Sequence, residues 1–178
     1  MFTLVVGGAA SGKSEYAEQL ILRAGALPRY YVATMEPFGA EARARIARHR
    51  VLRAQKRFET IECPVGLSRV LLPARGAALL ECLSNLAANE LYSPVGAGGE
   101  QAALAAVVDG VESLRRQCEA LVVVTGEVFS GGSAYAGDTG TYLRVLAAAN
   151  RALAARADAV CEVACGLPRY YKGEGAAL

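Results

Sequence analysis

The chain reads Gly7-Gly8-Ala9-Ala10-Ser11-Gly12-Lys13-Ser14 directly after the apolar run Phe2–Val6. Every fixed position of the phosphate-loop pattern G-x-x-x-x-G-K-[ST] is filled, and a helical pattern over Gly12–Ala24 follows. Glycines let such a loop fold into a cradle of inward-pointing N–H groups, and the helix N-terminus adds partial positive charge. We therefore predict that residues 7–14 bind nucleotide phosphates, that Lys13 reaches the β- and γ-phosphates, and that the Ser14 hydroxyl is a ligand of Mg²⁺.

Outside this loop, short apolar runs alternate with stretches of helical periodicity. The runs typical of buried strands are Phe2–Val6, Tyr30–Thr34, Ala77–Leu80, Leu121–Thr125 and Ala159–Ala164. The helical stretches are Gly12–Ala24, Gly39–Lys56, Leu83–Leu91, Gln101–Cys118 and Thr141–Arg156. This alternation indicates an α/β fold with a mostly parallel sheet flanked by helices. Phe58–Ile61 and Arg169–Tyr171 are candidate edge strands, and the Gly-rich segment Gly126–Gly140 is long enough for a lid or binding loop.

Length and composition limit the classes of protein that this chain can belong to. It has 178 residues and a mass of 18.6 kDa, which predicts one domain over residues 1–178. Hydrophobic residues make up 53% and charged residues 20%, a composition that excludes an intrinsically disordered chain. The net charge of +2 is too balanced for a general nucleic-acid binder, so we expect no nucleic-acid partner.

No segment of the sequence indicates a membrane or a secreted form. No apolar run approaches the roughly 20 residues of a membrane span, and no basic segment or cleavage site follows Met1. The cysteines are odd in number and lack the spacing of a zinc site: Cys63, Cys82, Cys118, Cys161 and Cys165. We interpret them as reduced, mostly buried thiols and expect a cytoplasmic protein.

Two of the predicted strands run into a glutamate. Glu81 follows Ala77–Leu80 directly, and Glu127 follows Leu121–Thr125 after one glycine. Ligands of open α/β sheets bind at the carboxyl ends of the strands, so we expect both carboxylates near the nucleotide. Glu81 is the better candidate for holding Mg²⁺, and Glu127 could assist with the metal or act as a base. The alternative is that both are surface carboxylates at strand ends.

The single histidine of the chain lies in a strongly basic helical stretch. Arg45, His49 and Arg53 recur every four residues, which places them in one row on a helix. Guanidinium groups match phosphate oxygens, and the cationic neighbours favour the neutral imidazole, which can attack an α-phosphate. The alternative is a solvated basic face with an incidental histidine.

Four features occur in order along almost the whole chain: the phosphate loop Gly7–Ser14, Arg45-Ile46-x-x-His49, Leu80-Glu81-Cys82, and Glu127-Val128. In this order and at this spacing they resemble the adenosylcobinamide kinase / adenosylcobinamide-phosphate guanylyltransferase family of cobalamin biosynthesis. The resemblance implies a RecA-type P-loop sheet and a homotrimer. It also implies two reactions, phosphorylation of adenosylcobinamide by ATP or GTP and transfer of GMP from GTP through a guanylylated histidine.

The family's functional positions fall on particular residues of this chain. The guanylylated histidine falls on His49, and the flanking arginines fall on Arg45 and Arg53. Phe58-x-Thr60-x-Glu62 resembles a family W-x-T-x-E stretch, which adds Glu62 to the nucleotide site. Glu81-Cys82 and Asn89 resemble the acidic strand end and the helix after it, Glu127-Val128 resembles an N-E-V turn, and Asn150 resembles the asparagine of a late helix.

The chain departs from the family pattern between residues 126 and 151. Gly126 replaces an asparagine, Leu143-Arg144 replaces an Arg-Asp pair, and Arg151 replaces a glutamine. From the residues alone, two other functions stay open. One is a P-loop kinase of another small metabolite that forms no covalent intermediate. The other is a non-catalytic nucleotide-binding protein that uses its basic helix as a docking face.

Overall fold

The computed structural model describes residues 1–25, 28–36, 56–128 and 137–173. Within these ranges a single sheet is formed by β1 (Phe2–Gly7), β2 (Arg29–Ala33), β3 (Phe58–Glu62), β4 (Gly76–Glu81), β5 (Cys118–Gly126), β6 (Ala159–Ala164) and β7 (Leu167–Lys172). The strand order is β3-β2-β4-β5-β1-β6-β7, and only β7 is antiparallel to its neighbour. The α/β fold and the mostly parallel sheet expected from the sequence are confirmed.

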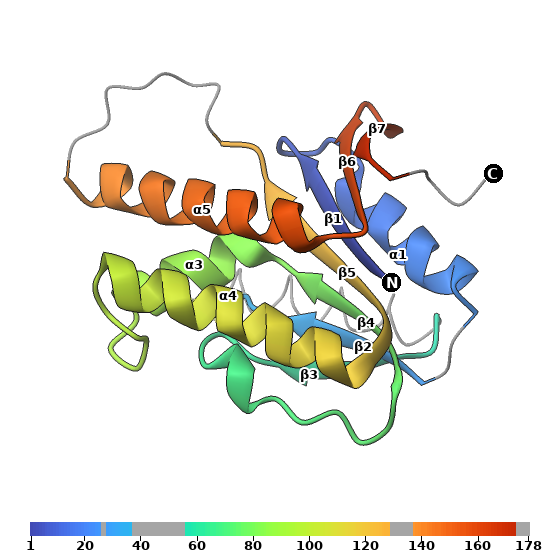
Figure 1. Cartoon of the computed structure of the whole chain (residues 1–178), viewed down its shortest axis with the longest axis horizontal. Helices are drawn as coiled ribbons and strands as arrows, with labels where there is room; N and C mark the ends of the chain where they lie inside the picture. Colours follow the sequence, from blue (N-terminus) through green and yellow to red (C-terminus); the bar gives the residue numbers. More distant parts are fainter. Residues whose placement is uncertain (26–27, 37–55, 129–136, 174–178) are drawn as a thin grey trace.

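Helices cover both faces of the sheet (Figure 1). The described helices are α1 (Lys13–Arg23), α3 (Leu83–Tyr92), α4 (Glu100–Gln117) and α5 (Gly137–Arg156), with a short 3₁₀ turn η1 (Leu67–Arg69). Helices α3, α4 and α5 pack on one face, and α1 packs on the other. No helix in the described part of the chain combines the length and apolar character that crossing a membrane requires.

Alternation along the strands decides which side chains meet which helices. Leu4 and Tyr30 belong to the core layer under α3–α5, whereas Val5 and Tyr31 belong to the layer under α1. Successive side chains of a strand point to opposite faces, so adjacent tyrosines serve different layers. Glu81 follows Leu79 by two residues and therefore extends from the α1 face.

The expected elements agree with the structure except at their ends. The candidate edge strands are confirmed as β3 and β7. Helix α5 begins at Gly137, earlier than expected, and the Tyr92 hydroxyl contacts the first turn by donating to Asp138 O. Cys118, expected to end a helix, begins β5 because its backbone is extended and its side chain is buried. All of the expected helix Gly39–Lys56 except its last residue, and much of Gly126–Gly140, lie outside the described residues.

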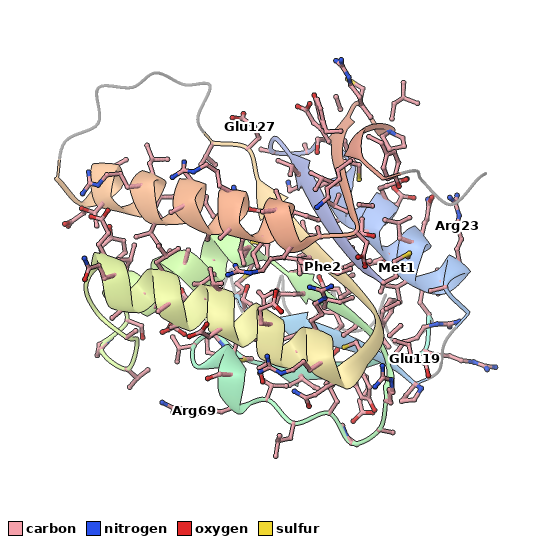
Figure 2. The ribbon with its side chains drawn as sticks, in the orientation of Figure 1. Met1, Phe2, Arg23, Arg69, Glu119 and Glu127 are labelled. Atoms are coloured by element: carbon pink, nitrogen blue, oxygen red, sulfur yellow. The ribbon has the colours of Figure 1, made fainter. Side chains whose placement is uncertain are left out.

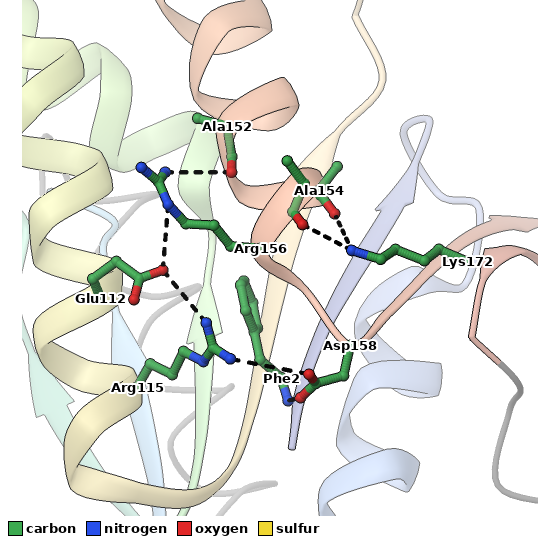
Figure 3. Close-up of polar contacts among 9 residues, drawn as sticks. Phe2, Glu112, Arg115, Ala152, Ala154, Arg156, Asp158 and Lys172 are labelled. Carbon is green, nitrogen blue, oxygen red and sulfur yellow. Dashed lines mark hydrogen bonds and ion pairs between the residues drawn. The ribbon is translucent and has the colours of Figure 1, made fainter.

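The carboxyl ends of the parallel strands meet along one side of the sheet, the carboxyl edge, and their amino ends meet along the opposite side, the amino edge (Figure 2). Glu127 lies beyond the carboxyl end of β5, and Met1, Phe2 and Glu119 lie at the other edge. At this amino edge the Phe2 N–H donates to Asp158 Oδ2 at 2.6 Å, and the Asp158 N–H donates to Phe2 O at 2.8 Å. Figure 3 shows the charged side chains around this contact, contributed by α4, α5 and β7.

Candidate nucleotide-binding site

The phosphate loop connects β1 to α1, and two of its glycines are required by their surroundings. Gly12 has φ +88°, and a Cβ there would lie 3.0 Å from Gly166 Cα. A Cβ on Gly7 would lie 2.5 Å from Ser11 Oγ and 2.8 Å from Val163 O. A side chain at either position would distort the loop or displace its neighbours, so the glycines of the motif have a steric basis here.

The turn between β6 and β7 packs against the back of this loop. Gly166 N–H donates to Ser11 O at 2.8 Å, across 155 positions of the sequence. Further along the hairpin, the hydroxyls of Tyr16 on α1 and Tyr170 on β7 are hydrogen-bonded at 2.7 Å. The antiparallel hairpin therefore supports both the phosphate loop and the helix that follows it.

The polar side chains of the loop meet the end of β4. Lys13 Nζ donates to Gly8 O at 2.9 Å, which holds the ammonium group over the loop. The Ser14 hydroxyl donates to Glu81 Oε1, as expected for a loop serine and a strand-end acid. The Tyr31 hydroxyl donates to the other carboxylate oxygen, Glu81 Oε2, at 2.8 Å. One carboxylate is thus held by β2 and by the start of α1.

Thr34 and Asn89 join the carboxyl ends of β2, β3 and β4. Thr34 N–H donates to Glu81 O at 3.1 Å, and Thr34 Oγ1 bonds to both the N–H and the carbonyl of Cys82 at 2.7 and 2.8 Å. Asn89 Nδ2 donates to Thr34 O at 2.8 Å and to Pro64 O at 2.9 Å. Asn89, singled out by the family resemblance, therefore ties together the strand ends around Glu81.

Cys82 follows Glu81 directly and is the N-cap residue of α3. Burial raises the pKa of its thiol, backbone N–H groups of Ser84 and Asn85 oppose that effect, and the Glu81 charge adds to it. The balance keeps the thiol protonated at neutral pH, so Cys82 is poorly suited to act as a nucleophile at this edge.

Glu127 lies beside the first glycine of the loop. Its N–H donates to Gly7 O at 3.0 Å, continuing the pairing of β1 with β5. Just before it, Gly126 N–H donates to Ser84 Oγ at 2.8 Å, and a Cβ on Gly126 would lie 2.9 Å from that oxygen. The Thr125 hydroxyl donates to Asn150 Oδ1 at 2.9 Å. The late-helix asparagine therefore anchors the strand end that carries Glu127.

The structure brings Glu81 and Glu127 close to the phosphate loop, which includes Ser14, and places Glu62 farther along the sheet. Ser14 and Glu81 are in contact, and Glu127 begins next to the loop. Glu62 ends β3 and is exposed, and in the sheet register Ala33 lies between it and Glu81, so it does not join the Ser14 contact. Arg45, His49 and Arg53 lie outside the described residues.

Tyr31 is the site residue that sequence reasoning missed. The pairs Tyr30-Tyr31 and Tyr170-Tyr171 are typical of core aromatics; Tyr31 is indeed buried, with 5% of its surface exposed, whereas Tyr171 is 60% exposed and does not belong to the core. Its polar end nevertheless reaches the Glu81 carboxylate. The available signal was its position, because it lies two residues before the end of β2 and on the same face of the sheet as Glu81.

The oxygen atoms at this edge fit a hard divalent cation. The Ser14 hydroxyl and the Glu81 carboxylate are donors of the kind that Mg²⁺ prefers. In nucleotide sites Mg²⁺ takes one or two protein carboxylates and fills its other positions with water and substrate phosphates. The described residues contain no group of three or more histidines, cysteines or acids suited to a metal, and a site of this nucleotide type needs none.

Comparison with known proteins identifies the family. The model of the family "Cobinamide kinase / cobinamide phosphate guanyltransferase" matches residues 3–170. The chain belongs to this family. Its match covers the phosphate loop, the Glu81 strand end and the Glu127 turn together, so the expectation from the sequence motifs is confirmed.

Curated members of the family are similar over most or nearly all of their length. The bifunctional adenosylcobalamin biosynthesis protein CobP of Pseudomonas aeruginosa is 31% identical over 98% of this chain and 99% of its own. The corresponding protein CobU of Salmonella typhimurium is 33% identical over 94% of this chain and 97% of its own. CobU of Escherichia coli is 32% identical over 74% of this chain and 77% of its own.

The solved structures that resemble this chain are more distant. The RadB recombinase has a TM-score of 0.47 and 18% identity, covering 90% of this chain and 73% of its own. The flagellar accessory protein FlaH from Methanocaldococcus jannaschii has a TM-score of 0.47 and 11% identity, covering 97% of this chain and 78% of its own.

Proposed function

We propose that this chain phosphorylates adenosylcobinamide with ATP or GTP and then transfers GMP from GTP to adenosylcobinamide-phosphate, forming adenosylcobinamide-GDP. The observation that carries the proposal is the contact of Ser14 with Glu81 inside a complete phosphate loop, in a chain whose family match spans residues 3–170. This arrangement is built for nucleoside triphosphates, and the family is named for acting on cobinamide and its phosphate.

In the phosphorylation step the loop positions the triphosphate. The N–H groups of residues 7–14 and the Lys13 ammonium bind the phosphate oxygens and stabilise the charge that develops on them. Ser14 and Glu81 hold Mg²⁺, which when bound neutralises phosphate charge and orients the transferred group. Glu127, next to the loop, accepts the proton of the attacking hydroxyl as a base.

In the guanylyl-transfer step His49 is the nucleophile. Its neutral imidazole nitrogen attacks the α-phosphorus of GTP, a P–N bond forms, and the bond from that phosphorus to the bridging oxygen breaks to release pyrophosphate. An oxygen of adenosylcobinamide-phosphate then attacks the same phosphorus and displaces the histidine. Arg45 and Arg53 stabilise the phosphate charge, and Glu62 contributes to binding of the nucleotide.

Intact-protein mass after incubation with GTP and Mg²⁺ tests the covalent step. The wild-type chain should gain one acid-labile guanylyl group, and His49→Ala should gain none while still binding GTP. Since the chain has one histidine, no second imidazole can take over the reaction. A wild-type chain that binds GTP without gaining mass would overturn the histidine mechanism.

A matched variant separates the two reactions. Glu127→Gln keeps the shape of the side chain and removes its basicity, so it should slow phosphorylation of cobinamide while the guanylyl adduct still forms. His49→Ala should show the reverse pattern. Equal loss of both reactions in Glu127→Gln would contradict the assignment of Glu127 as the base of the kinase step.

The proposal also covers the organisation of the protein. We take residues 1–178 as a single P-loop transferase domain that forms a homo-oligomer, a trimer by the family resemblance, and works in the cytoplasm. All five cysteines are free, which suits a reducing compartment. Light scattering coupled to size-exclusion chromatography measures the oligomeric state, and a monomer at micromolar concentration would contradict the trimer.

A further inference from the structure

The Glu81 carboxylate is held on both of its oxygens. Ser14 donates to Oε1 from the start of α1, and Tyr31 donates to Oε2 at 2.8 Å from β2. A hydrogen bond to an ionised carboxylate is about twice as strong as one between neutral groups. With Oε2 occupied by a phenol, Oε1 is the oxygen turned toward the phosphate loop.

The core, rather than the site, fixes the position of the Tyr31 hydroxyl. The side chain is 5% exposed, and its ring meets the Phe58 ring edge-on, with centroids 6.0 Å apart and an angle of 87° between the rings. Strand β2 is paired on both sides, with β3 and β4. A donor held in this way does not have to be ordered when a ligand arrives, so its hydrogen bond orients Glu81 in advance.

We propose that Tyr31 is a positioning residue, which orients Glu81 so that Mg²⁺ strengthens nucleotide binding at the phosphate loop. The proposal rests on the proposed function for the identity of the ligand. Tyr31 contacts neither substrate nor metal in this scheme and acts through the carboxylate. Its contribution therefore depends on Glu81 being present.

Two adjacent tyrosines of β2 provide the test. Tyr31→Phe removes the hydroxyl that donates to Glu81. Tyr30→Phe is the matched control: it removes a hydroxyl that accepts from Ala74 N–H at 3.1 Å, and its ring lies in the opposite core layer. The affinity for a fluorescent GTP analogue is measured with and without Mg²⁺. Tyr31→Phe should reduce the gain in affinity from Mg²⁺ roughly tenfold, and Tyr30→Phe should leave that gain unchanged.

A double-mutant cycle shows whether Tyr31 acts through Glu81. In a Glu81→Gln background, Tyr31→Phe should have little further effect on the Mg²⁺-dependent gain, because the carboxylate through which Tyr31 acts is already absent. A merely structural role would lower the affinity equally with and without Mg²⁺, or lower the unfolding temperature alone. Either of these results, or additive effects in the cycle, would overturn the proposal.

The same binding measurement separates this proposal from the proposed function. If the wild-type chain fails to act on cobinamide but Tyr31→Phe still loses the gain from Mg²⁺, the proposed function is wrong and the role of Tyr31 stands. If the wild-type chain is active and Tyr31→Phe keeps the full gain, only the role of Tyr31 is overturned.

Discussion

The two edges of the sheet use charged side chains for different purposes. At the amino edge Glu112 pairs with Arg115 at 3.7 Å and with Arg156 at 3.9 Å, and Arg115 also reaches Asp158 at 4.0 Å (Figure 3). These charges neutralise one another.

At the carboxyl edge the polar groups come from separate elements and converge beside a loop of backbone N–H groups. Ser14, Tyr31 and Glu81 meet there, and Lys13 lies over the loop. The difference teaches that mutual pairing neutralises charges within the chain with little gain in stability, whereas convergence around an anion cradle prepares a site for a ligand. Changes at the carboxyl edge should therefore alter activity, and changes at the amino edge should spare it.

The largest expected effect follows removal of the loop ammonium. Lys13→Ala should lower phosphorylation of cobinamide by roughly 10²–10³-fold, because a positioned donor to developing phosphate charge is lost. A steady-state kinase assay checks it. Lys172→Ala is the matched control, since Lys172 donates to Ala154 O and Ala155 O near the other edge and should keep activity. Equal losses of kinase activity in both variants would contradict the assignment of activity to the carboxyl edge alone.

A change in the loop backbone should have the next largest effect. Gly12→Ala places a side chain at φ +88° and within 3.0 Å of Gly166 Cα, at a cost of about 1–2 kcal/mol in backbone strain alone. We expect about tenfold weaker GTP binding, measured by titration with a fluorescent analogue. Gly8→Ala is the stability control, because a Cβ there meets no atom within 4 Å and the variant should unfold at the wild-type temperature.

A change at the amino edge should lower stability and spare activity. Asp158→Ala removes the acceptor of the Phe2 N–H, and we expect a loss of about 1 kcal/mol in the free energy of unfolding. The side chain is 53% exposed, so its ion pair with Arg115 adds little. Chemical denaturation measures the effect, and Asp158→Asn, which keeps an acceptor oxygen, should recover most of it. A loss of catalytic rate beyond the loss of folded protein would count against this assignment.

An exposed ion pair away from both edges should have the smallest effect. Arg144 donates to both oxygens of Glu100, and this hydrogen bond lowers the pKa of the Glu100 carboxyl. A lowered pKa contributes stability above the ordinary value of 4.5, and that contribution is lost as the pH falls through the folded-state pKa. Arg144→Ala should therefore lower the unfolding temperature slightly at neutral pH and not at all in strong acid. A drop of equal size at both pH values would contradict the ion pair as its cause.

The elements of the fold could be predicted from the sequence because their causes are local. Apolar runs such as Leu121–Thr125 and the helical repeat of Gln101–Cys118 each carry their own periodicity. Boundaries were less accurate because neighbouring elements determine them. Cys118 continues a helical pattern in the sequence, and its pairing with Gly76 of β4 makes it a strand residue.

The candidate site could be predicted in part for a similar reason. The motif around Lys13 and Ser14 and the strand-end position of Glu81 are visible in the sequence, and the structure brings Ser14 and Glu81 into contact. The hydroxyl of Tyr31 was not predictable as a partner of Glu81. Its role depends on β2 lying next to β4, and no periodicity within either strand specifies that neighbour.

The sequence by itself therefore determined the phosphate loop, the layers of the sheet and the family to which the chain belongs. Only the tertiary structure decided that Tyr31 orients Glu81, that the β6–β7 turn supports Ser11, and that Asn150 anchors the end of β5. A local motif carries its own backbone geometry, because glycine and helix-start preferences act over a few residues. Contacts between residues 50 or 155 positions apart form only when hydrophobic packing has chosen which strands are neighbours.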